Sequence, residues 1–284
     1  MAQVLSGKDV AAAVTEEVAA KAEELKAASI EPCLAILRVG ERDDDLSYER
    51  GATKRAASCG VAIKNVVLPA DVEQAELEAN ITALNEDDSV HGVLMFLPLP
   101  KHLDSDAAKA LLAPAKDMDG ITTGSLAAVF ANAGDGYAPC TAAACMEILK
   151  HYEIETCGKK AAVIGRSLVI GRPVAMMLMH ANATPVICHT RTVDAPSITR
   201  EADIVVVAAG RMETIGADYF APGQTVIDVG ISWNDEKGKL CGDVIYDEVE
   251  PIVGAITPVP GGVGAVTTSV LMKHVVEAAA KTAK

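Results

Sequence analysis

Hydrophobic and polar residues along the first half of the chain follow two alternating patterns. Three stretches place apolar residues at helical spacing, which predicts helices at residues 10–28, 45–59 and 73–85. Short apolar runs lie between them and predict buried strands at 33–39, 61–68 and 92–97. Pro32 ends the first helix, and Gly60 stands where a helix C-terminus favours glycine. This strand–helix alternation is typical of a mostly parallel sheet covered by helices on both faces.

The second half of the chain repeats the alternation after a stretch rich in Gly and Asp. That stretch, residues 114–139, is interpreted as the crossing between two domains, and a helix at 141–152 follows it. The next predicted strands are 161–164, 185–189, 202–208 and 225–229. A helix ending at His180 lies between the first two of these strands, and a final helix covers 268–283. The pattern predicts the α/β class with two domains, the second of Rossmann type.

Length and composition narrow the class of protein and its partners. At 284 residues the chain is long enough for about two domains, and its core needs no disulfide or metal. Half of the residues are hydrophobic but only 3% are aromatic, so the core must be aliphatic, and base stacking on aromatic rings is not expected. The formal net charge of −14 repels phosphate backbones, so we expect neither nucleic acid nor an anionic membrane as a partner. An anionic ligand must be held by a local cluster of donors.

Cysteines and histidines are scattered without the spacing of a metal site. None of the seven cysteines forms a CxxC pair, which is typical of reduced thiols in a cytoplasmic protein. The six histidines show no HxxxH spacing, so we predict no metal. The first residues, MAQVLSGKDV, lack the basic and apolar regions of a secretory signal, and no apolar run reaches the ~18 residues of a membrane-spanning helix. We therefore expect a cytoplasmic protein.

The segment VIGRSLVIGRP, residues 163–173, joins a predicted strand to a predicted helix. Gly165 allows a tight turn and Gly171 allows close packing or the close approach of a phosphate, while free N–H groups at the new helix face an anion. The spacing differs from GxGxxG, so the glycine pair alone is also compatible with a plain strand-to-helix turn. The strand–helix series that follows over ~100 residues favours a dinucleotide site.

The end of the next strand indicates which dinucleotide would bind. An NAD enzyme usually places an Asp or Glu there to bind the ribose 2′-hydroxyl. This chain has His189, Thr190 and Arg191 instead, and Arg166 in the preceding loop. Two arginines without an acidic residue suit a 2′-phosphate, so we predict NADP as the cofactor, with NAD as the alternative. The other interpretation of Arg191 is a solvated surface charge.

Six segments carry a resemblance that covers essentially the whole chain. In order, they are VGERDDDLSY (39–48), GVLMFLPLP (92–100), KDMDG (116–120), VIGRSLVIGRP (163–173), IDVGI (227–231) and ITPVPGGVGAVT (256–267). With these segments the chain resembles the bifunctional methylenetetrahydrofolate dehydrogenase/methenyltetrahydrofolate cyclohydrolase (FolD) family. PVPGGVG in particular is specific to that family.

The resemblance implies a two-domain subunit with a folate cleft between the domains, working as a cytoplasmic homodimer in one-carbon metabolism and purine biosynthesis. The folate-binding and catalytic domain would be residues 1–140 with the returning helix 268–284, and the NAD(P)-binding Rossmann domain would be 141–267. The reaction would transfer a hydride from 5,10-methylenetetrahydrofolate, with tetrahydrofolate as the carrier, to NADP. A second activity would hydrolyse the methenyl product to 10-formyltetrahydrofolate.

The resemblance also assigns candidate site residues. Tyr48 matches an active-site tyrosine, and Asp119 can accept hydrogen bonds from two pterin N–H groups at once; the alternatives are an ordinary half-buried tyrosine and a turn or capping aspartate. The candidate substrate-binding residues, which include a Pro-rich apolar wall, are Tyr48, Leu97, Pro98, Leu99, Pro100, Asp119, Gly261, Gly262 and Val263. The candidate cofactor-binding residues are Gly165, Arg166, Ser167, Gly171, Pro173, His189, Thr190, Arg191, Ala209, Gly210, Gly230, Ile231 and Thr267.

Among the positions that depart from the family pattern, two concern the second activity. Most members have a Lys four residues after the Tyr, one helical turn away, where it serves the hydrolysis. Here that residue is Ala52, and the Gln that supports the Lys is replaced by Phe96. Lys54 is the first candidate to take over the role, although it lies ~240° around the helix from Tyr48. The catalytic candidates are therefore Tyr48, Lys54 and Asp119, and the hydrolase activity is in question.

Three alternatives stay open at this stage. One is a dehydrogenase without cyclohydrolase activity, and another is a non-catalytic folate- or nucleotide-binding protein. The third is another two-domain dehydrogenase, such as a shikimate or amino-acid dehydrogenase, which explains the second half of the chain but not PVPGGVG or KDMDG. Turnover of a folate substrate would exclude the non-catalytic protein and the other dehydrogenases, but not a dehydrogenase without cyclohydrolase activity.

Overall fold

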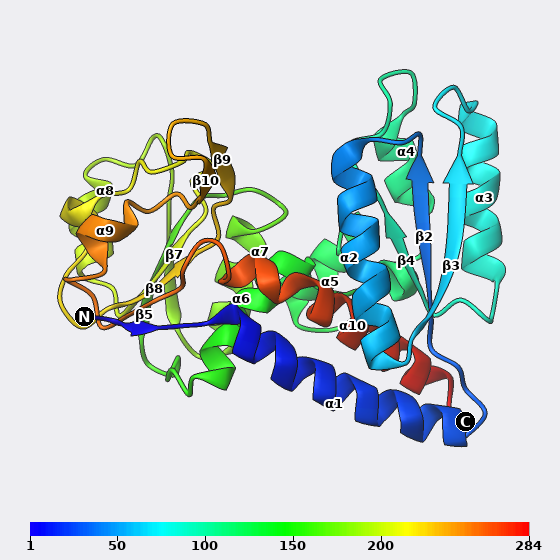
Figure 1. Ribbon diagram of the computed structural model, residues 1–284, viewed down its shortest axis with the longest axis horizontal. Coiled ribbons are helices and arrows are strands. Elements are labelled where there is room, and N and C mark those ends of the chain that lie inside the picture. The colour runs from blue at the N-terminus through cyan, green and yellow to red at the C-terminus, as the bar shows by residue number, and fades with distance from the viewer. Residues whose placement is uncertain (284) are drawn as a thin grey trace. The chain divides into compact units, whose positions relative to one another are not determined.

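The computed structural model describes residues 1–283, which divide into two compact units (Figure 1). The six-stranded unit comprises residues 1–11 and 141–267, and the three-stranded unit comprises residues 12–140 and the chain from 268 onward. Each unit is therefore discontinuous in sequence. None of the helices in the described residues is long and apolar enough to cross a membrane.

A sheet of parallel strands forms the centre of the three-stranded unit. Its strands are β2 (Cys33–Val39), β3 (Ala62–Leu68) and β4 (Gly92–Met95), in the order β3–β2–β4. The central strand β2 is buried along almost its whole length, whereas the edge strand β3 is partly exposed. The helices wholly or mostly in this unit are α1 (Gly7–Ala27), α2 (Asp43–Cys59), α3 (Gln74–Glu86), α4 (Ser105–Leu111), the 3₁₀ turn η1 (Pro114–Lys116), α5 (Thr123–Ala131) and α10 (Thr267–Thr282).

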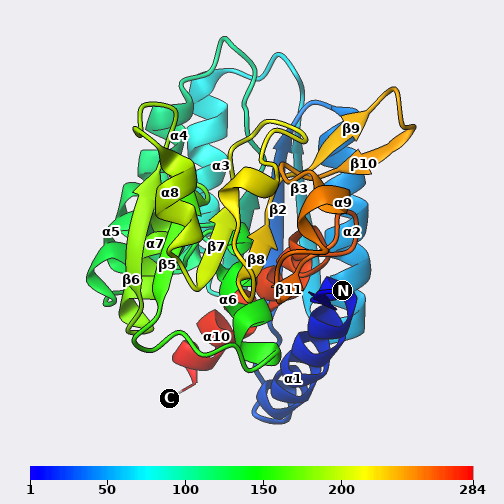
Figure 2. The same cartoon turned by 90° about the vertical axis from the view of Figure 1, so that its left-hand side faces the viewer.

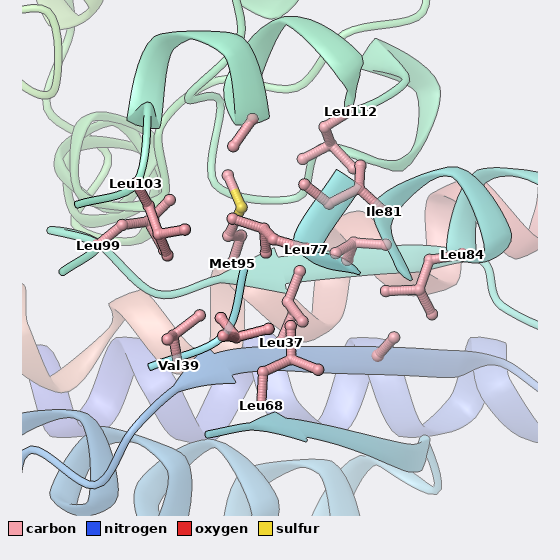
Figure 3. Close-up of a cluster of buried hydrophobic side chains, with 14 of the residues drawn as sticks. Leu37, Val39, Leu68, Leu77, Ile81, Leu84, Met95, Leu99, Leu103 and Leu112 are labelled. Carbon is pink, nitrogen blue, oxygen red and sulfur yellow. The ribbon is translucent and has the colours of Figure 1, made fainter. Parts of the chain in front are cut away.

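Aliphatic side chains fill the core between this sheet and helices α3 and α4 (Figure 3). Helix α3 contributes Leu77, Ile81 and Leu84, which are three and four residues apart and therefore share one helix face. They belong to one cluster with Leu37 of β2 and Met95 of β4. No aromatic side chain belongs to this cluster of described residues, in keeping with the low aromatic content.

The six-stranded unit is built on an all-parallel sheet in the order β1–β11–β8–β7–β5–β6 (Figure 2). Its strands are β1 (Gln3–Val4), β5 (Lys160–Ile164), β6 (Thr184–Cys188), β7 (Ile204–Val207), β8 (Thr225–Asp228) and β11 (Ala255–Ile256). A separate antiparallel pair joins β9 (Ser232–Asn234) to β10 (Lys239–Cys241). The helices wholly or mostly in this unit are α6 (Cys140–His151), α7 (Gly171–His180), α8 (Ala195–Arg200), η2 (Ala217–Tyr219), α9 (Tyr246–Val249) and η3 (Val263–Ala265). The α/β class expected from the sequence is confirmed.

The strand order of this sheet reverses at β5, whose neighbours are β6 on one side and β7 on the other. Strands β5, β7 and β8 are buried along nearly their whole length, as expected for parallel strands covered on both faces. In open α/β sheets, ligands bind outside the carboxyl ends of the strands at such a reversal. The topology therefore predicts a ligand site beyond the ends of β5, β6 and β7.

Two features differ from the division expected from the sequence. Strand β1 pairs with β11, so residues 1–11 group with the six-stranded unit and not with residues 12–140. Two paired residues are too few to show a period in the sequence. The stretch interpreted as a crossing between domains contains helix α5, whose first turn is capped because the Thr122 hydroxyl accepts from the Ser125 N–H at 3.0 Å.

Candidate functional site

The loop after β5 takes its shape from two glycines. Gly165 has a φ of +131°, and an added Cβ there would lie 2.2 Å from the carbonyl oxygen of Ala208, just after β7. An added Cβ at Gly171, the first residue of α7, would lie 2.2 Å from the Gly165 carbonyl oxygen. Ser167 Oγ accepts a hydrogen bond from the Ile170 N–H at 3.1 Å and closes the turn between them. Close backbone approach therefore requires both glycines, independently of any ligand.

A cavity of about 530 Å³ lies at the carboxyl ends of β5, β6 and β7, where the strand order reverses. Six predicted cofactor-binding residues line it: Gly165, Arg166, Ser167, His189, Thr190 and Ala209. The other lining residues are Ile164, Cys188, Ala195, Ala208, Arg211, Thr214, Ile215 and Tyr219. Ligand sites in proteins commonly measure roughly 300–1,000 Å³, so this cavity is large enough for a substantial part of a dinucleotide.

Positive charge gathers in this cavity. Arg166 and Arg211 line it together with His189, and within residues 1–283 no carboxylate is among the lining side chains. His189 Nδ1 accepts from the Arg191 N–H at 3.1 Å, and the His189 N–H donates to Thr192 Oγ1 at 2.8 Å, so the turn after β6 is closed on itself. The same described residues contain no group of three or more His, Cys, Asp or Glu side chains that could hold a metal ion. The guanidinium groups of Arg166 and Arg211 suit an anionic ligand.

In the three-stranded unit, the ring of Tyr48 on α2 packs edge-on against Phe96, which directly follows β4. The two ring centroids are 5.8 Å apart and the planes lie at 84°. The residues of the Pro-rich run 97–100 differ in exposure. Leu99 is buried in the core cluster of Figure 3, whereas Pro98 is exposed. The carbonyl of Pro98 accepts from Arg42 Nη1 at 3.1 Å, which ties this run to the start of α2. Only part of the predicted apolar wall is therefore accessible.

Asp119 is half-buried and bonded to the start of helix α6. Its Oδ1 accepts from the N–H of Cys140, the first residue of that helix, at 3.1 Å. Burial raises the pKa of Asp119, and the Cys140 N–H opposes this rise. The neighbouring Asp117 closes its own turn, because its two oxygens accept from the N–H groups of Ile121 and Thr122 at 3.1 and 2.8 Å. The capping bond of Asp119 thus engages one of its two carboxylate oxygens.

Comparison with known proteins assigns both parts of the chain to the same family. Residues 5–119 match the model of the tetrahydrofolate dehydrogenase/cyclohydrolase catalytic domain. Residues 139–283 match the model of the tetrahydrofolate dehydrogenase/cyclohydrolase NAD(P)-binding domain. The chain belongs to the tetrahydrofolate dehydrogenase/cyclohydrolase family. The resemblance seen in the sequence segments is therefore confirmed.

Relatives of this family match along nearly the whole chain. A bifunctional protein FolD from Carboxydothermus hydrogenoformans is 50% identical over 279 residues, which cover 98% of this chain and 97% of that protein. A crystal structure of the bifunctional enzyme FolD from Campylobacter jejuni has a TM-score of 0.94 at 39% identity and covers 99% of both chains. The FolD of Trypanosoma brucei, solved in complex with NADP cofactor and an inhibitor, has a TM-score of 0.90 at 36% identity and covers 99% of this chain and 98% of its own.

Two residues that depart from the tetrahydrofolate dehydrogenase/cyclohydrolase pattern lie on or beside helix α2. The helix runs without interruption, so Ala52 stands one turn after Tyr48, and Ala52 is fully buried. Lys54 is exposed and lies ~240° around a regular helix from Tyr48. The structure therefore does not bring Lys54 to the side of the helix that carries Tyr48, whose ring packs against Phe96.

Several predicted residues lie outside the cavity lining. Among the cofactor candidates these are Gly171, Pro173, Arg191, Gly210, Gly230, Ile231 and Thr267. Among the substrate candidates in the six-stranded unit, the Gly261 carbonyl accepts from the Gly7 N–H at 2.8 Å. Gly261 is partly exposed, Gly262 is buried, and Val263 is only 2% exposed. This last segment is thus held firmly by contacts within its own unit.

Sequence reasoning missed three polar residues of the cavity lining, namely Arg211, Thr214 and Tyr219. A signal for Arg211 was present, because it follows the buried run that becomes β7 and the carboxyl ends of parallel strands share one edge of a sheet. Ala209 and Gly210, which follow the same strand, are among the predicted cofactor-binding residues, but the predicted site does not extend to Arg211. Thr214 and Tyr219 come from an irregular segment and a single 3₁₀ turn, whose course no hydrophobic period predicts.

Proposed function

We propose that the protein oxidises 5,10-methylenetetrahydrofolate to 5,10-methenyltetrahydrofolate by hydride transfer to NADP. The observation that carries this proposal is the positively charged cavity at the carboxyl ends of β5, β6 and β7, in a chain that matches both domain models of one family. Because the chain spans nearly the full length of its relatives, it contains the catalytic and the dinucleotide-binding halves of such an enzyme.

The choice of NADP over NAD rests on charge. NADP carries an additional phosphate on the ribose, and guanidinium groups bind phosphate through paired, charge-assisted hydrogen bonds. Arg166 and Arg211 offer such groups, and no lining carboxylate within residues 1–283 would repel the phosphate. The NADP complex of the Trypanosoma brucei relative supports the same choice.

The roles of the folate-side residues follow from what hydride transfer requires. The cofactor supplies the hydride acceptor, so the protein's own task is to bind and orient two flat rings and to exclude water. We assign the apolar contact to exposed Pro98 and half-buried Leu97, and the recognition of pterin N–H groups to Asp119. Tyr48, held against Phe96, would limit the rotation of the bound substrate.

For the second reaction of the family, we propose that hydrolysis of the methenyl product is slow in this protein. A positioned general acid or base contributes about 10²–10⁴ in rate. The Ala52 methyl group cannot transfer a proton, and Lys54 lies on another side of α2. Phe96 offers no polar group beside Tyr48. The methenyl product would then leave the enzyme largely unhydrolysed.

We also propose that the enzyme is a cytoplasmic homodimer, the usual form in the family that the chain resembles. The net charge of −14 supports the expectation that nucleic acids and anionic membranes are not partners. Gel filtration with light scattering tests the oligomeric state. A monomeric mass at micromolar concentration would refute the homodimer without affecting the proposed reaction.

Two absorbance assays on one purified sample test the proposed reactions. The first follows reduction of NADP, and separately of NAD, with methylenetetrahydrofolate. The second follows the loss of methenyltetrahydrofolate above its spontaneous hydrolysis, with the Lys54→Ala variant beside the parent. Reduction of NADP without accelerated hydrolysis is the expected result. Binding of both ligands without turnover would favour a non-catalytic protein, and fast hydrolysis that disappears in Lys54→Ala would return the catalytic role to that lysine.

A further inference from the structure

Two buried carboxylates, Asp228 and Asp243, lie side by side in the six-stranded unit. Asp228 is the last residue of β8, and the two side chains belong to residues that are 3% and 1% exposed. Among the described residues neither carboxylate forms an ion pair with a cation. Burial raises the pKa of both groups, and the charge of Asp243 adds to the rise at Asp228. Such an arrangement costs folding free energy, because burial disfavours the ionised form of each carboxyl group and no cation within residues 1–283 offsets this cost.

Backbone N–H groups take the place of a cation around Asp228. Its Oδ1 accepts from Gly230 at 2.9 Å and from the Asp243 N–H at 3.2 Å, and its Oδ2 accepts from Val244 at 3.0 Å. The fit is tight, because an added Cβ at Gly242 would lie 1.9 Å from Asp228 Oδ2. Asp228 therefore fixes the segment 242–244 against the end of β8.

Asp243 in turn holds the loop that follows β7. Its Oδ2 accepts from the Gly210 N–H at 2.7 Å, and its own carbonyl accepts from the N–H groups of Thr214 at 2.9 Å and Ile215 at 3.1 Å. The Gly242 carbonyl adds a bond from the Glu213 N–H at 2.9 Å. The side chain and the backbone of this one residue thus attach the loop at both of its ends.

This attached loop, residues 209–215, forms one wall of the positively charged cavity. Ala209, Arg211, Thr214 and Ile215 all line the cavity, although Asp243 itself does not. Arg211 directly follows the glycine whose N–H is bound by Asp243 Oδ2. The hydrogen bond from the Gly210 N–H to Asp243 Oδ2 therefore fixes the backbone next to Arg211 and, with it, the direction of the Arg211 side chain.

We propose that Asp243 is a positioning residue for the dinucleotide: its carboxylate holds the backbone at Gly210 so that Arg211 and the rest of the loop form the wall against which the cofactor phosphates bind. This proposal depends on the proposed function in one respect, namely that NADP binds in this cavity. It predicts that the carboxylate acts on cofactor binding and leaves folate binding unchanged.

The two carboxylate oxygens of Asp243 differ in their hydrogen bonds. Oδ1 is buried without a hydrogen-bond partner among the described residues, so only Oδ2 acts as an acceptor. Asparagine can keep that bond through its amide oxygen, whereas alanine leaves the Gly210 N–H without an acceptor. A buried N–H without an acceptor costs free energy, and here that cost weakens the loop that contacts the cofactor. We expect it to lower the affinity for NADP by roughly tenfold.

The experiment compares Asp243→Ala and Asp243→Asn with the parent, and uses Asp247→Asn as a control that removes one exposed carboxylate from the same unit. Calorimetry gives the Kd of NADP, and steady-state kinetics gives kcat and the KM values of both substrates. We expect Asp243→Ala to raise the Kd and KM of NADP about tenfold with the folate KM unchanged. Asp243→Asn should recover most of the affinity, and Asp247→Asn should match the parent.

Unchanged NADP affinity in a folded Asp243→Ala protein, or equal losses of NADP and folate affinity, would overturn the proposal. If the Asp243→Ala variant does not fold, amide hydrogen exchange of the parent protein tests the proposal instead. The amides of Gly210, Thr214 and Ile215 should gain protection when NADP binds and none when folate binds. A parent that binds NADP but turns over no folate would refute the proposed reaction and leave this binding test intact.

Discussion

Replacing Asp228 with asparagine should change how the stability of the protein depends on pH. Burial in the six-stranded unit raises the pKa of this carboxyl from 3.8 to about 7, against the opposing effect of three backbone N–H groups. Asparagine fills nearly the same volume and cannot ionise. A comparison of the parent with Asp228→Asn therefore isolates the titration of this single group from the other acidic residues.

The size of the effect follows from the difference between the folded and unfolded proteins. A pKa about three units higher in the folded state corresponds to about 4 kcal/mol, at about 1.36 kcal/mol for each unit. Below about pH 4 the carboxyl is neutral in both states and contributes no penalty. Between about pH 4 and pH 7 the unfolded chain releases the proton while the folded protein keeps it, so the stability of the parent relative to the variant falls as the pH rises. Above about pH 7 the difference stays constant.

Thermal melting followed by circular dichroism measures this difference, because the single tryptophan, Trp233, is exposed and reports poorly on the core. A change of about 4 kcal/mol corresponds to roughly 10 °C in Tm for domains of this size. We expect the Tm of the parent minus that of Asp228→Asn to fall by about this amount between about pH 4.5 and pH 8. The control Asp247→Asn should show no comparable trend. A difference that stays within about 2 °C over this range would refute the reasoning.

Three further predictions concern the two units separately. Replacing Arg166 with serine should raise the KM of NADP about tenfold or more and that of NAD much less, because it removes a cation from the cavity; equal effects on both dinucleotides in the reduction assay would contradict the assignment. The double variant Ala52→Lys with Phe96→Gln should accelerate hydrolysis of methenyltetrahydrofolate by about 10² or more, and each single variant, measured beside it, should gain less; no gain in the folded double variant would argue against our explanation of the slow second reaction. Replacing Glu49 with alanine should lower stability by about 3 kcal/mol, because it leaves the Arg38 guanidinium, now paired at 2.7 Å, buried without its partner; an unchanged Tm would show that this pair contributes little.

Much of the fold could be predicted because its elements are long and periodic. Leu77, Ile81 and Leu84 share a helix face in the sequence as in the structure. Three mostly apolar runs form the buried strands β2, β5 and β8. The glycine loop after β5 was recognisable because Gly165 and Gly171 flank the junction of a strand and a helix. In each case the signal lies within a few neighbouring residues.

The parts that escaped prediction depend on residues far apart in the sequence. Strand β1 consists of two residues and exists because β11 lies beside it. In the sequence, Asp228 is an ordinary residue at the end of a strand and Asp243 an ordinary loop residue. Only the folded chain places them in contact. Arg211 lines the cavity because Asp243 holds the glycine before it, a relation that no local period encodes. Tertiary contacts decide such positions, and a single sequence does not display them.

The discontinuity of both units constrains how the chain can fold as it leaves the ribosome. The Ala2 N–H donates to Glu250 Oε1 across 248 residues, and the hydroxyls of Thr15 and Ser269 meet across 254. The six-stranded unit cannot gain β11 before residue 256 has been synthesised, and the three-stranded unit cannot gain α10 before residue 282. The nascent protein must therefore carry incomplete apolar surfaces while residues 12–254 are being synthesised. A premature stop before α10 would leave the three-stranded unit without its last helix and expose the apolar surface beneath it to proteases.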